Sequence, residues 1–198
     1  MNNIKAKEAA EKRINTMITP KKIKDWEKRI AERLNPKFDG SLNVNILPVS
    51  EDPKSEVITD ICRQASGVAT GLYLEDLIPL CNQDFQRSPP NSGHDLNIPE
   101  IVGVDVKMST ETVKKGDKKK VSSTLKDKCH QFEDCFWVEF FGAPKSEDID
   151  GVMWYSGSDA HRKLGLSEAN VNWISEKVDE FRKKSFQDIK KSLVRNIM

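Results

Sequence analysis

The most constraining feature of this sequence is a β-branched run near its middle, Ile101-Val-Gly-Val-Asp-Val-Lys-Met108. Valine and isoleucine favour strands, and successive residues of a strand point to opposite faces of a sheet. Val104 and Val106 therefore share one face, and Asp105 and Lys107 share the other. The pattern predicts a strand over 101–108 whose valine face lies in the core and whose other face carries a carboxylate beside an ammonium.

A second carboxylate, Asp95, lies shortly before this strand. Residues 97–99 (Asn-Ile-Pro) have the composition of a turn, so we expect the chain before them to run antiparallel to the strand and to bring Asp95 near Asp105. Two carboxylates held together repel unless a cation lies between them. Mg²⁺ is bound by one or two carboxylates and keeps several waters. A lysine beside such an ion orients or deprotonates a water, or stabilises charge on a phosphate. The pattern therefore predicts a site for phosphodiester hydrolysis.

Asp95 followed by Asp105-Val106-Lys107 resembles the signature of the PD-(D/E)xK nucleases, and the chain around it is similar to a type II restriction endonuclease. The resemblance covers residues 54–142. His94 stands where the signature has proline, and the spacing is at the short end of the family's range. The resemblance implies Asp95, Asp105 and Lys107 as catalytic residues, with the two aspartates as ligands of Mg²⁺.

Several enzymes of that family add a carboxylate from the helix that precedes the sheet. Here that helix is predicted over 54–65, and Glu56 or Asp60 is the candidate, with Glu56 counted among the catalytic residues. The alternative is that Glu56 is a first-turn acid that only favours the helix dipole. Glu139 shares a predicted strand, 136–142, with aromatic residues, and this pattern favours a structural role.

The expected fold is of the α/β (mixed α+β) class, with the αβββαβ core of the restriction-endonuclease type and a mixed sheet flanked by helices. A chain of 198 residues is expected to form one domain. Other features are predicted as follows: a helical arm over 1–36, a strand or extended arm over 42–47, a catalytic core over 54–142, a helix from Ser122 to about 134, and a long helix over 166–197. A small-residue joint is predicted over 66–71, and the segment 73–85 after it is either a kinked helix or two short pieces.

Local charge provides the signal for a polyanionic partner, because the whole chain carries only +1. The segment from Lys107 to Lys128 holds eight lysines and three acids, a net charge of +5. Lysines that meet phosphates release counterions, which favours binding to DNA. Gly116-Asp117 in the part up to Val121 predicts a hairpin tip or a mobile loop, and the alternative to DNA contact is a solvated charged loop. The residues expected to contact DNA lie in this lysine-rich segment, in the loop 86–93 and at the position that follows this loop. They are Arg87, Asn91, Ser92, His94, Ser109, Lys114, Lys115, Lys118, Lys119 and Lys120.

Other classes of partner are disfavoured by missing patterns. The sequence has no window resembling a membrane span and no GxxxxGK[ST] loop, so neither a membrane nor a nucleotide cofactor is expected. Four cysteines without a CxxC pair, and an N-terminus without an apolar leader, favour reduced thiols and a cytoplasmic location.

Three functions agree with these observations. The favoured one is a Mg²⁺-dependent type II restriction endonuclease that acts on double-stranded DNA as a homodimer, because a two-fold axis relates the two DNA strands. The second is a structure-selective repair or junction nuclease of the same fold. The third is a non-catalytic DNA-binding protein in which Asp105 and Lys107 form a surface salt pair.

Overall fold

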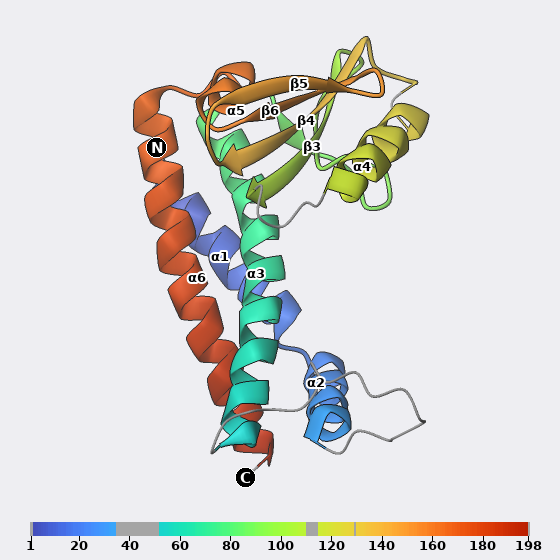
Figure 1. Ribbon diagram of the computed structural model, residues 1–198. Coiled ribbons are helices and arrows are strands. Elements are labelled where there is room, and N and C mark those ends of the chain that lie inside the picture. Colours follow the sequence, from blue (N-terminus) through green and yellow to red (C-terminus); the bar gives the residue numbers. More distant parts are fainter. Residues whose placement is uncertain (1, 35–51, 110–114, 129, 198) are drawn as a thin grey trace. The chain divides into compact units, whose positions relative to one another are not determined.

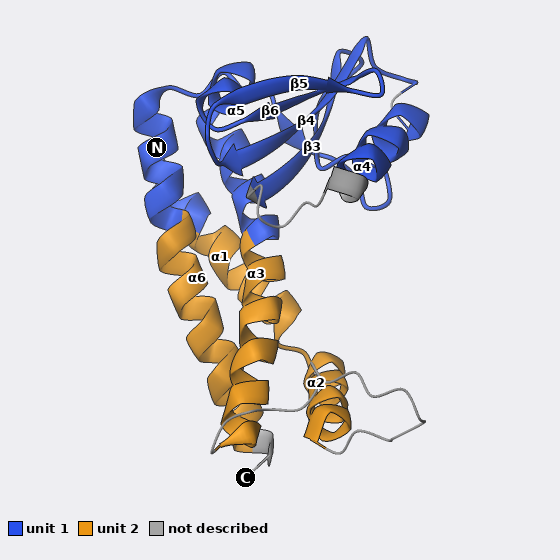
Figure 2. Cartoon of the chain, in the orientation of Figure 1, with its two compact units in different colours: residues 1–6, 71–177 blue, residues 7–70, 178–198 orange. Residues whose placement is uncertain are grey.

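The computed structural model describes residues 2–34, 52–109, 115–128 and 130–197, without the side chains at 109, 115–117, 196 and 197. The chain divides into two compact units (Figure 2). Unit 1 contains residues 1–6 and 71–177, and unit 2 contains residues 7–70 and 178–198. Each is described by itself below.

Six helices occur in the described part of the chain (Figure 1). Two of them confirm the helices predicted in the N-terminal arm. The second begins as its sequence predicts, because the Thr19 hydroxyl accepts a hydrogen bond from the Lys22 amide at 3.3 Å and Pro20 occupies the first helical position. The bounds of the helices are α1 Asn3–Met17, α2 Pro20–Leu34, α3 Pro53–Cys81, α4 Lys115–Lys128, α5 Ser158–Lys163 and α6 Glu168–Ile197.

α3 is a single helix, so the predicted joint at 66–71 is wrong. A glycine inside a helix costs about 1 kcal/mol, and no group packs against the position where Gly67 lacks a side chain. The neighbouring positions are buried and hydrogen-bonded. The Ser66 hydroxyl lies 2.7 Å from that of Ser185 on α6, and the Thr70 hydroxyl donates to the Ser66 carbonyl at 2.6 Å. We attribute the continuity of α3 to burial and to the contacts of Ser66 with α6, which override the weak local preference.

The strands form one six-stranded sheet in the order β1-β2-β3-β4-β6-β5. The β1-β2-β3 part is antiparallel, β4 is parallel to both β3 and β6, and β5 is antiparallel to β6. α4 forms the crossover between the parallel strands β3 and β4, as such a connection requires. The bounds are β1 Gln86–Arg87, β2 Leu96–Ile98, β3 Val102–Ser109, β4 Asp134–Phe141, β5 Lys145–Ile149 and β6 Val152–Ser156.

The predicted α/β class with a mixed sheet is confirmed, and the elements from α3 to β4 follow the predicted αβββαβ order. The first strand of that order, β1, lies within the segment predicted as a loop over 86–93. It has only two residues, which is too short for a periodic signal. The predicted strand over 42–47 lies outside the described residues.

The two faces of the sheet are covered by different helices. On the α4 face, the Trp137 indole donates a hydrogen bond to the Ser122 hydroxyl at 3.1 Å, and a core cluster joins Leu125 of α4 to Trp137 and Trp154. On the opposite face, which we call the α5 face, His161 of α5 packs on the Phe140 ring with centroids 4.6 Å apart. Both faces are therefore packed in unit 1.

α4 begins seven residues before the predicted start at Ser122 and ends at Lys128 instead of near 134. The predicted loop is therefore wrong over 115–121, while 110–114 lie outside the described residues. Ser122 does not cap a helix. Its hydroxyl is buried and receives the Trp137 indole N–H, and Val121 packs beside the core cluster. These contacts favour helix in a lysine-rich segment that has almost no apolar stripe of its own.

α6 confirms the predicted C-terminal helix and passes through Lys183-Lys184-Ser185 without a break. The Ser167 hydroxyl caps it by accepting a hydrogen bond from the Asn170 amide at 3.2 Å. Within unit 2 its apolar stripe is buried, with Phe181 at 3%, Ile189 at 1% and Leu193 at 0% exposure. Although α3 and α6 are long, none of the helices in the described ranges is apolar enough to cross a membrane.

The cysteines do not all match the expectation of reduced thiols. Cys62 and Cys81 are free, and burial raises the pKa of the Cys62 thiol to about 11. Cys135, at the start of β4, is disulfide-bonded, so the expectation is wrong at that position.

Candidate active site

A hairpin of β2 and β3 positions the first acidic side chain. Leu96 pairs with Val104 and Ile98 with Val102, so the predicted antiparallel hairpin is present. Its turn lies over 98–101 and not at 97–99: the Ile101 amide bonds to the Ile98 carbonyl at 3.1 Å, and Glu100 has a φ of 66°. Proline at the second position of such a turn is favourable because its φ is already set.

The pairing continues one residue beyond β2 and brings Asp95 opposite the second carboxylate. The Asp95 amide donates to the Val104 carbonyl at 2.8 Å. The Val106 amide in turn donates to Asp95 Oδ2 at 2.8 Å. Asp95 is thus fixed against β3 by main-chain and side-chain hydrogen bonds.

The alternation predicted for β3 is present. Val104 and Val106 are 0% and 5% exposed on the α5 face, whereas the side chains of Asp105 and Lys107 are 17% and 34% exposed on the α4 face. The Lys107 ammonium forms an ion pair with Asp105 Oδ1 and lies 3.9 Å from Asp95 Oδ2. The structure therefore brings three of the four predicted catalytic side chains together, two carboxylates around one ammonium.

The Asp105 carboxyl has an altered acidity. Burial and the neighbouring charge of Asp95 raise its pKa from 3.8 to about 6, and Lys107 opposes this rise. Burial has the larger effect because it removes water from the charged form. A carboxyl that titrates near pH 6 is sensitive to any cation that approaches the pair.

The two aspartates fit a hard divalent cation by their chemistry. Asp95 and Asp105 supply carboxylate oxygens, and a single ammonium contacts this pair of acids. Within the described ranges, no group of three or more acidic, histidine or cysteine side chains is arranged to hold a metal ion. Mg²⁺ does not need such a group, because it keeps several waters and binds through one or two carboxylates.

Glu139 is a further acid of this region that the sequence pattern assigned to a structural role. It lies on β4 directly beside Lys107 in the strand register, on the α4 face, and it is 0% exposed. Among the described residues, neither of its carboxylate oxygens forms a hydrogen bond of normal geometry. Burial raises the pKa of Glu139, while the Lys118 charge and the Trp154 indole oppose the rise. A buried acid without such bonds costs stability, so its position beside Lys107 calls for a functional account.

Two residues predicted to contact DNA, His94 and Arg87, contact other groups of the protein instead. The His94 ring is buried edge-on against Phe132, with ring centroids 4.9 Å apart, and burial lowers its pKa. It is not accessible to DNA in this structure, which corrects the prediction for that residue. Arg87 forms ion pairs with Glu75 and Asp76 of α3, within unit 1, so its guanidinium is engaged by carboxylates.

The remaining predicted DNA contacts stay predictions. Asn91, Lys119 and Lys120 are exposed, and Ser92 is half-buried with its hydroxyl donating to the His94 carbonyl at 2.9 Å. Lys118 is half-buried, and its ammonium lies 3.3 Å from the centre of the Trp154 ring. Lys114 and the side chains of Ser109 and Lys115 lie outside the part of the chain that is described.

The predicted additional acid, Glu56, belongs to unit 2, whereas the aspartate pair belongs to unit 1. It is exposed in the first turn of α3, where a negative charge favours the helix dipole. The other candidate, Asp60, forms an ion pair with Arg33 of α2.

No protein-family model and no curated protein sequence matches this chain. The geometry of Asp95, Asp105 and Lys107 is therefore the basis for any functional conclusion.

Proposed function

We propose that this protein is a Mg²⁺-dependent endonuclease of the PD-(D/E)xK type that hydrolyses double-stranded DNA at a short specific sequence, as type II restriction endonucleases do. One observation carries the proposal: Asp95, Asp105 and Lys107 meet on one face of β2 and β3. The αβββαβ order of the elements around them supports it.

In this proposal Asp95 and Asp105 hold the metal ion. When bound, Mg²⁺ would polarise the scissile phosphate and lower the pKa of a bound water. The Val106 amide keeps Asp95 in place through its hydrogen bond to Oδ2. Partial burial of Asp105 weakens the competition of bulk water for the carboxylate.

In this proposal Lys107 provides a positive charge beside the phosphoryl oxygens of the reacting phosphate. Its ammonium contacts both carboxylates, and about one third of the Lys107 side chain is exposed, which leaves room for a phosphate or an attacking water. The oxygen of the water bonds to phosphorus and its proton passes to solvent, while the P–O ester bond breaks and the leaving sugar oxygen takes up a proton. Charge accumulates on the phosphoryl oxygens as this happens. A fixed cation stabilises that charge more than it stabilises the ground state.

We assign Glu139 a positioning role in the same proposal, because it is buried beside Lys107 without hydrogen bonds of normal geometry. Replacement by glutamine keeps the shape and removes the charge. We expect Glu139→Gln to shift the pH profile of cleavage and to leave DNA affinity unchanged. A purely structural Glu139 would instead change the free energy of unfolding and leave the pH profile in place.

A homodimer and a cytoplasmic location remain parts of the proposal. Two copies related by a two-fold axis would supply one site to each DNA strand. Analytical ultracentrifugation with and without a duplex tests the dimer. A monomer that cuts both strands in a single binding event would overturn this part alone.

The test of the activity is a digestion of plasmid DNA with Mg²⁺ and with EDTA. We expect discrete fragments with Mg²⁺ and none with EDTA, and we expect Asp105→Asn to cut at least 10³-fold more slowly, an order of magnitude typical of lost transition-state stabilisation. Asp134→Asn, an exposed acid at the start of β4, is the matched control. Cleavage confined to branched DNA would indicate the repair or junction nuclease.

A non-catalytic DNA-binding protein is the second candidate, favoured by the ion pairs that Lys107 already makes with both aspartates. In that case the duplex is shifted in a gel but stays intact with Mg²⁺, and Asp105→Asn has no effect on the DNA. That result would remove the nuclease proposal.

A further inference from the structure

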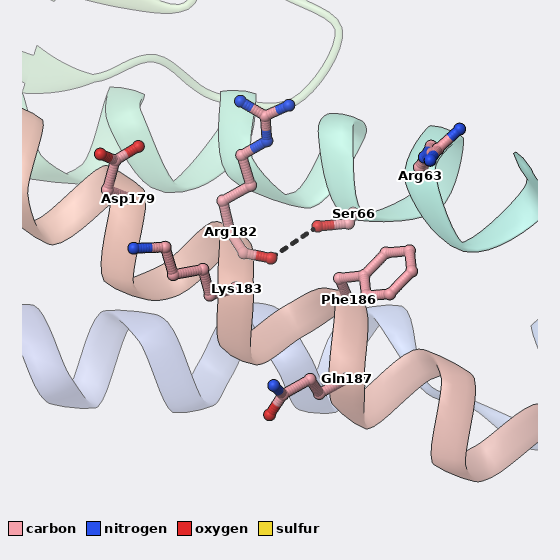
Figure 3. A pocket seen from close by; sticks show the side chains of 7 residues that line it. All are labelled: Arg63, Ser66, Asp179, Arg182, Lys183, Phe186 and Gln187. Carbon is pink, nitrogen blue, oxygen red and sulfur yellow. Dashed lines mark hydrogen bonds between the residues drawn. The ribbon is translucent and has the colours of Figure 1, made fainter. Parts of the chain in front are cut away.

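Unit 2 carries a cationic surface that the proposed active site does not use. Two hollows of about 420 Å³ each lie along α6, and Figure 3 shows the first, whose lining comes from α3 and α6. Their cationic lining residues are Arg63, Arg182, Lys183, Lys190, Lys191 and Arg195, which we call the basic stripe. Along α6 the members 182, 183, 190, 191 and 195 are successively one, seven, one and four positions apart. Spacings of four, seven and eight residues keep them along one side of the helix.

The basic stripe is exposed and lacks countercharges. All six side chains are exposed, and none of them forms an ion pair with a carboxylate in the described part of the chain. Asp179 is the one acid that lines either hollow. Six like charges on one surface without carboxylate partners repel one another, which an anionic partner would relieve.

The two helices that carry the basic stripe are joined by hydrogen bonds. The Ser66 hydroxyl donates to the Arg182 carbonyl at 3.2 Å (Figure 3). It also lies 2.7 Å from the Ser185 hydroxyl, so α3 is joined to α6 at the first hollow. From Arg182 to Arg195 the helix rises about 20 Å at 1.5 Å per residue. That length corresponds to about six phosphates of one DNA strand at 3.4 Å each.

The same observations disfavour a lipid surface as the partner. An interfacial helix binds a membrane by inserting its apolar face. In unit 2 the apolar face of α6 is not available for this, because its residues Val178, Phe181, Ile189 and Leu193 are already buried within the protein. The charged surface that remains includes three arginines, whose planar guanidinium groups bind phosphates in a bidentate manner.

We infer that the basic stripe is a second DNA contact, which binds backbone phosphates without reading bases. The inference rests on the proposed function in taking DNA as the ligand, and it assigns a role to unit 2 that the aspartate pair does not supply.

The test uses the full chain, a labelled duplex of about 20 base pairs and EDTA to prevent cleavage. The variant Arg63→Gln/Arg182→Gln/Lys183→Gln removes three charges of the stripe. The control Lys7→Gln/Lys12→Gln/Lys184→Gln removes three exposed lysines outside it. Circular dichroism melts establish that both variants are folded, and fluorescence anisotropy gives affinity over a salt series.

We expect the stripe variant to bind at least tenfold more weakly at 0.1 M salt. Its slope of log K against log salt should fall by up to about 2.7, at about 0.9 for each phosphate that is no longer neutralised. The control should stay within twofold of the unchanged protein. An unchanged slope in the stripe variant, or an equal loss of affinity in both variants, would overturn the inference.

Two further measurements separate the possible explanations. Binding to anionic phospholipid vesicles that depends on the stripe, with normal DNA affinity, would identify a lipid surface and reject DNA. Plasmid cleavage by the unchanged protein reports on the proposed function separately. If the stripe variant loses DNA affinity while the unchanged protein never cuts, the stripe assignment stands and the nuclease assignment fails. If cutting is seen and the stripe variant binds normally, the reverse holds.

Discussion

The two faces of β3 carry out different tasks with alternate residues of one strand. The valines at 104 and 106 are packed in the dry core of the α5 face, whereas Asp105 and Lys107 on the α4 face retain part of their exposure to water. The first face stabilises the fold through buried apolar area. The second holds the like charges of Asp95 and Asp105 together at a cost. Single substitutions should therefore separate stability from chemistry, since the side chains of the two faces are joined only through the backbone.

The largest expected effect comes from removing the Lys107 ammonium on the α4 face of β3, which is the polar face of this strand. Lys107→Ala should lower the single-turnover rate of DNA cleavage by about 10²–10⁴-fold at saturating Mg²⁺, because no other ammonium contacts both aspartates in the described structure. Lys145→Ala, on β5 of the same sheet, is the control and should retain its rate. A Lys107→Ala protein that keeps more than a tenth of the rate would show that the polar face does not perform the chemistry.

The next effect tests the apolar face. Leu96 pairs with Val104 and is 0% exposed, so Leu96→Ala should lower the free energy of unfolding by about 2–5 kcal/mol. Urea unfolding measures this decrease. Cleavage by the fraction that stays folded should keep its Mg²⁺ dependence. Equal decreases in stability and in rate per folded molecule would mean that the faces are coupled after all.

The pH dependence of stability sharpens the contrast. The pKa of Asp105 rises from 3.8 to about 6 on folding, so the folded protein holds this proton more tightly than the unfolded chain does. Its contribution is complete below pH 4 and is lost as the pH rises through 6, a change of about 3 kcal/mol. In EDTA, urea unfolding from pH 4.5 to pH 8 should show about 2 kcal/mol of this decline, and Asp105→Asn should lack it. Parallel curves for the two proteins would contradict the altered acidity of Asp105.

The smallest expected effect concerns the packing of α4 on the polar face. Lys118 lies 3.3 Å from the centre of the Trp154 ring, and such a cation–π contact contributes about 1 kcal/mol. Lys118→Met should lower the free energy of unfolding by that amount, while Lys119→Met at an exposed neighbouring position should not change it. If Lys118→Met instead leaves stability unchanged and weakens DNA binding, the Lys118 side chain contacts DNA, as the sequence predicts.

The hairpin and β3 could be predicted because their signals are local. Alternation over eight residues fixes which side chains share a face, and a turn nearby fixes the direction of the preceding chain. The predicted turn is misplaced by one residue because Asn97 and Pro99 both favour turns, whereas the register of Leu96 and Ile98 with β3 decides between them.

The continuity of α3 through 66–71 and the start of α4 could not be predicted, because distant residues determine both. Ser66 is held by Ser185, which is 119 positions away, and Ser122 is held by Trp137 across the crossover. Local composition in both segments, with glycines in one and lysines in the other, favours a loop. Helix propensity is a weak signal that such contacts override.

The burial of Glu139 depends on strand pairing in the same way. The alternation of β4 does show that it shares a face with Trp137, and this signal is present in the sequence. What could not be inferred is that β4 lies parallel to β3 with Glu139 at the level of Lys107. The burial of Glu139 beside Lys107 therefore became visible only with the order of the strands in the sheet.

The ion pairs of Lys107 bear on the order in which the molecule is assembled. An internal ammonium already balances part of the charge of the two aspartates, so under the proposed function the chain would not need Mg²⁺ in order to fold. Binding of the ion would then be an exchange, in which Mg²⁺ would replace an ammonium that stays nearby on the same strand.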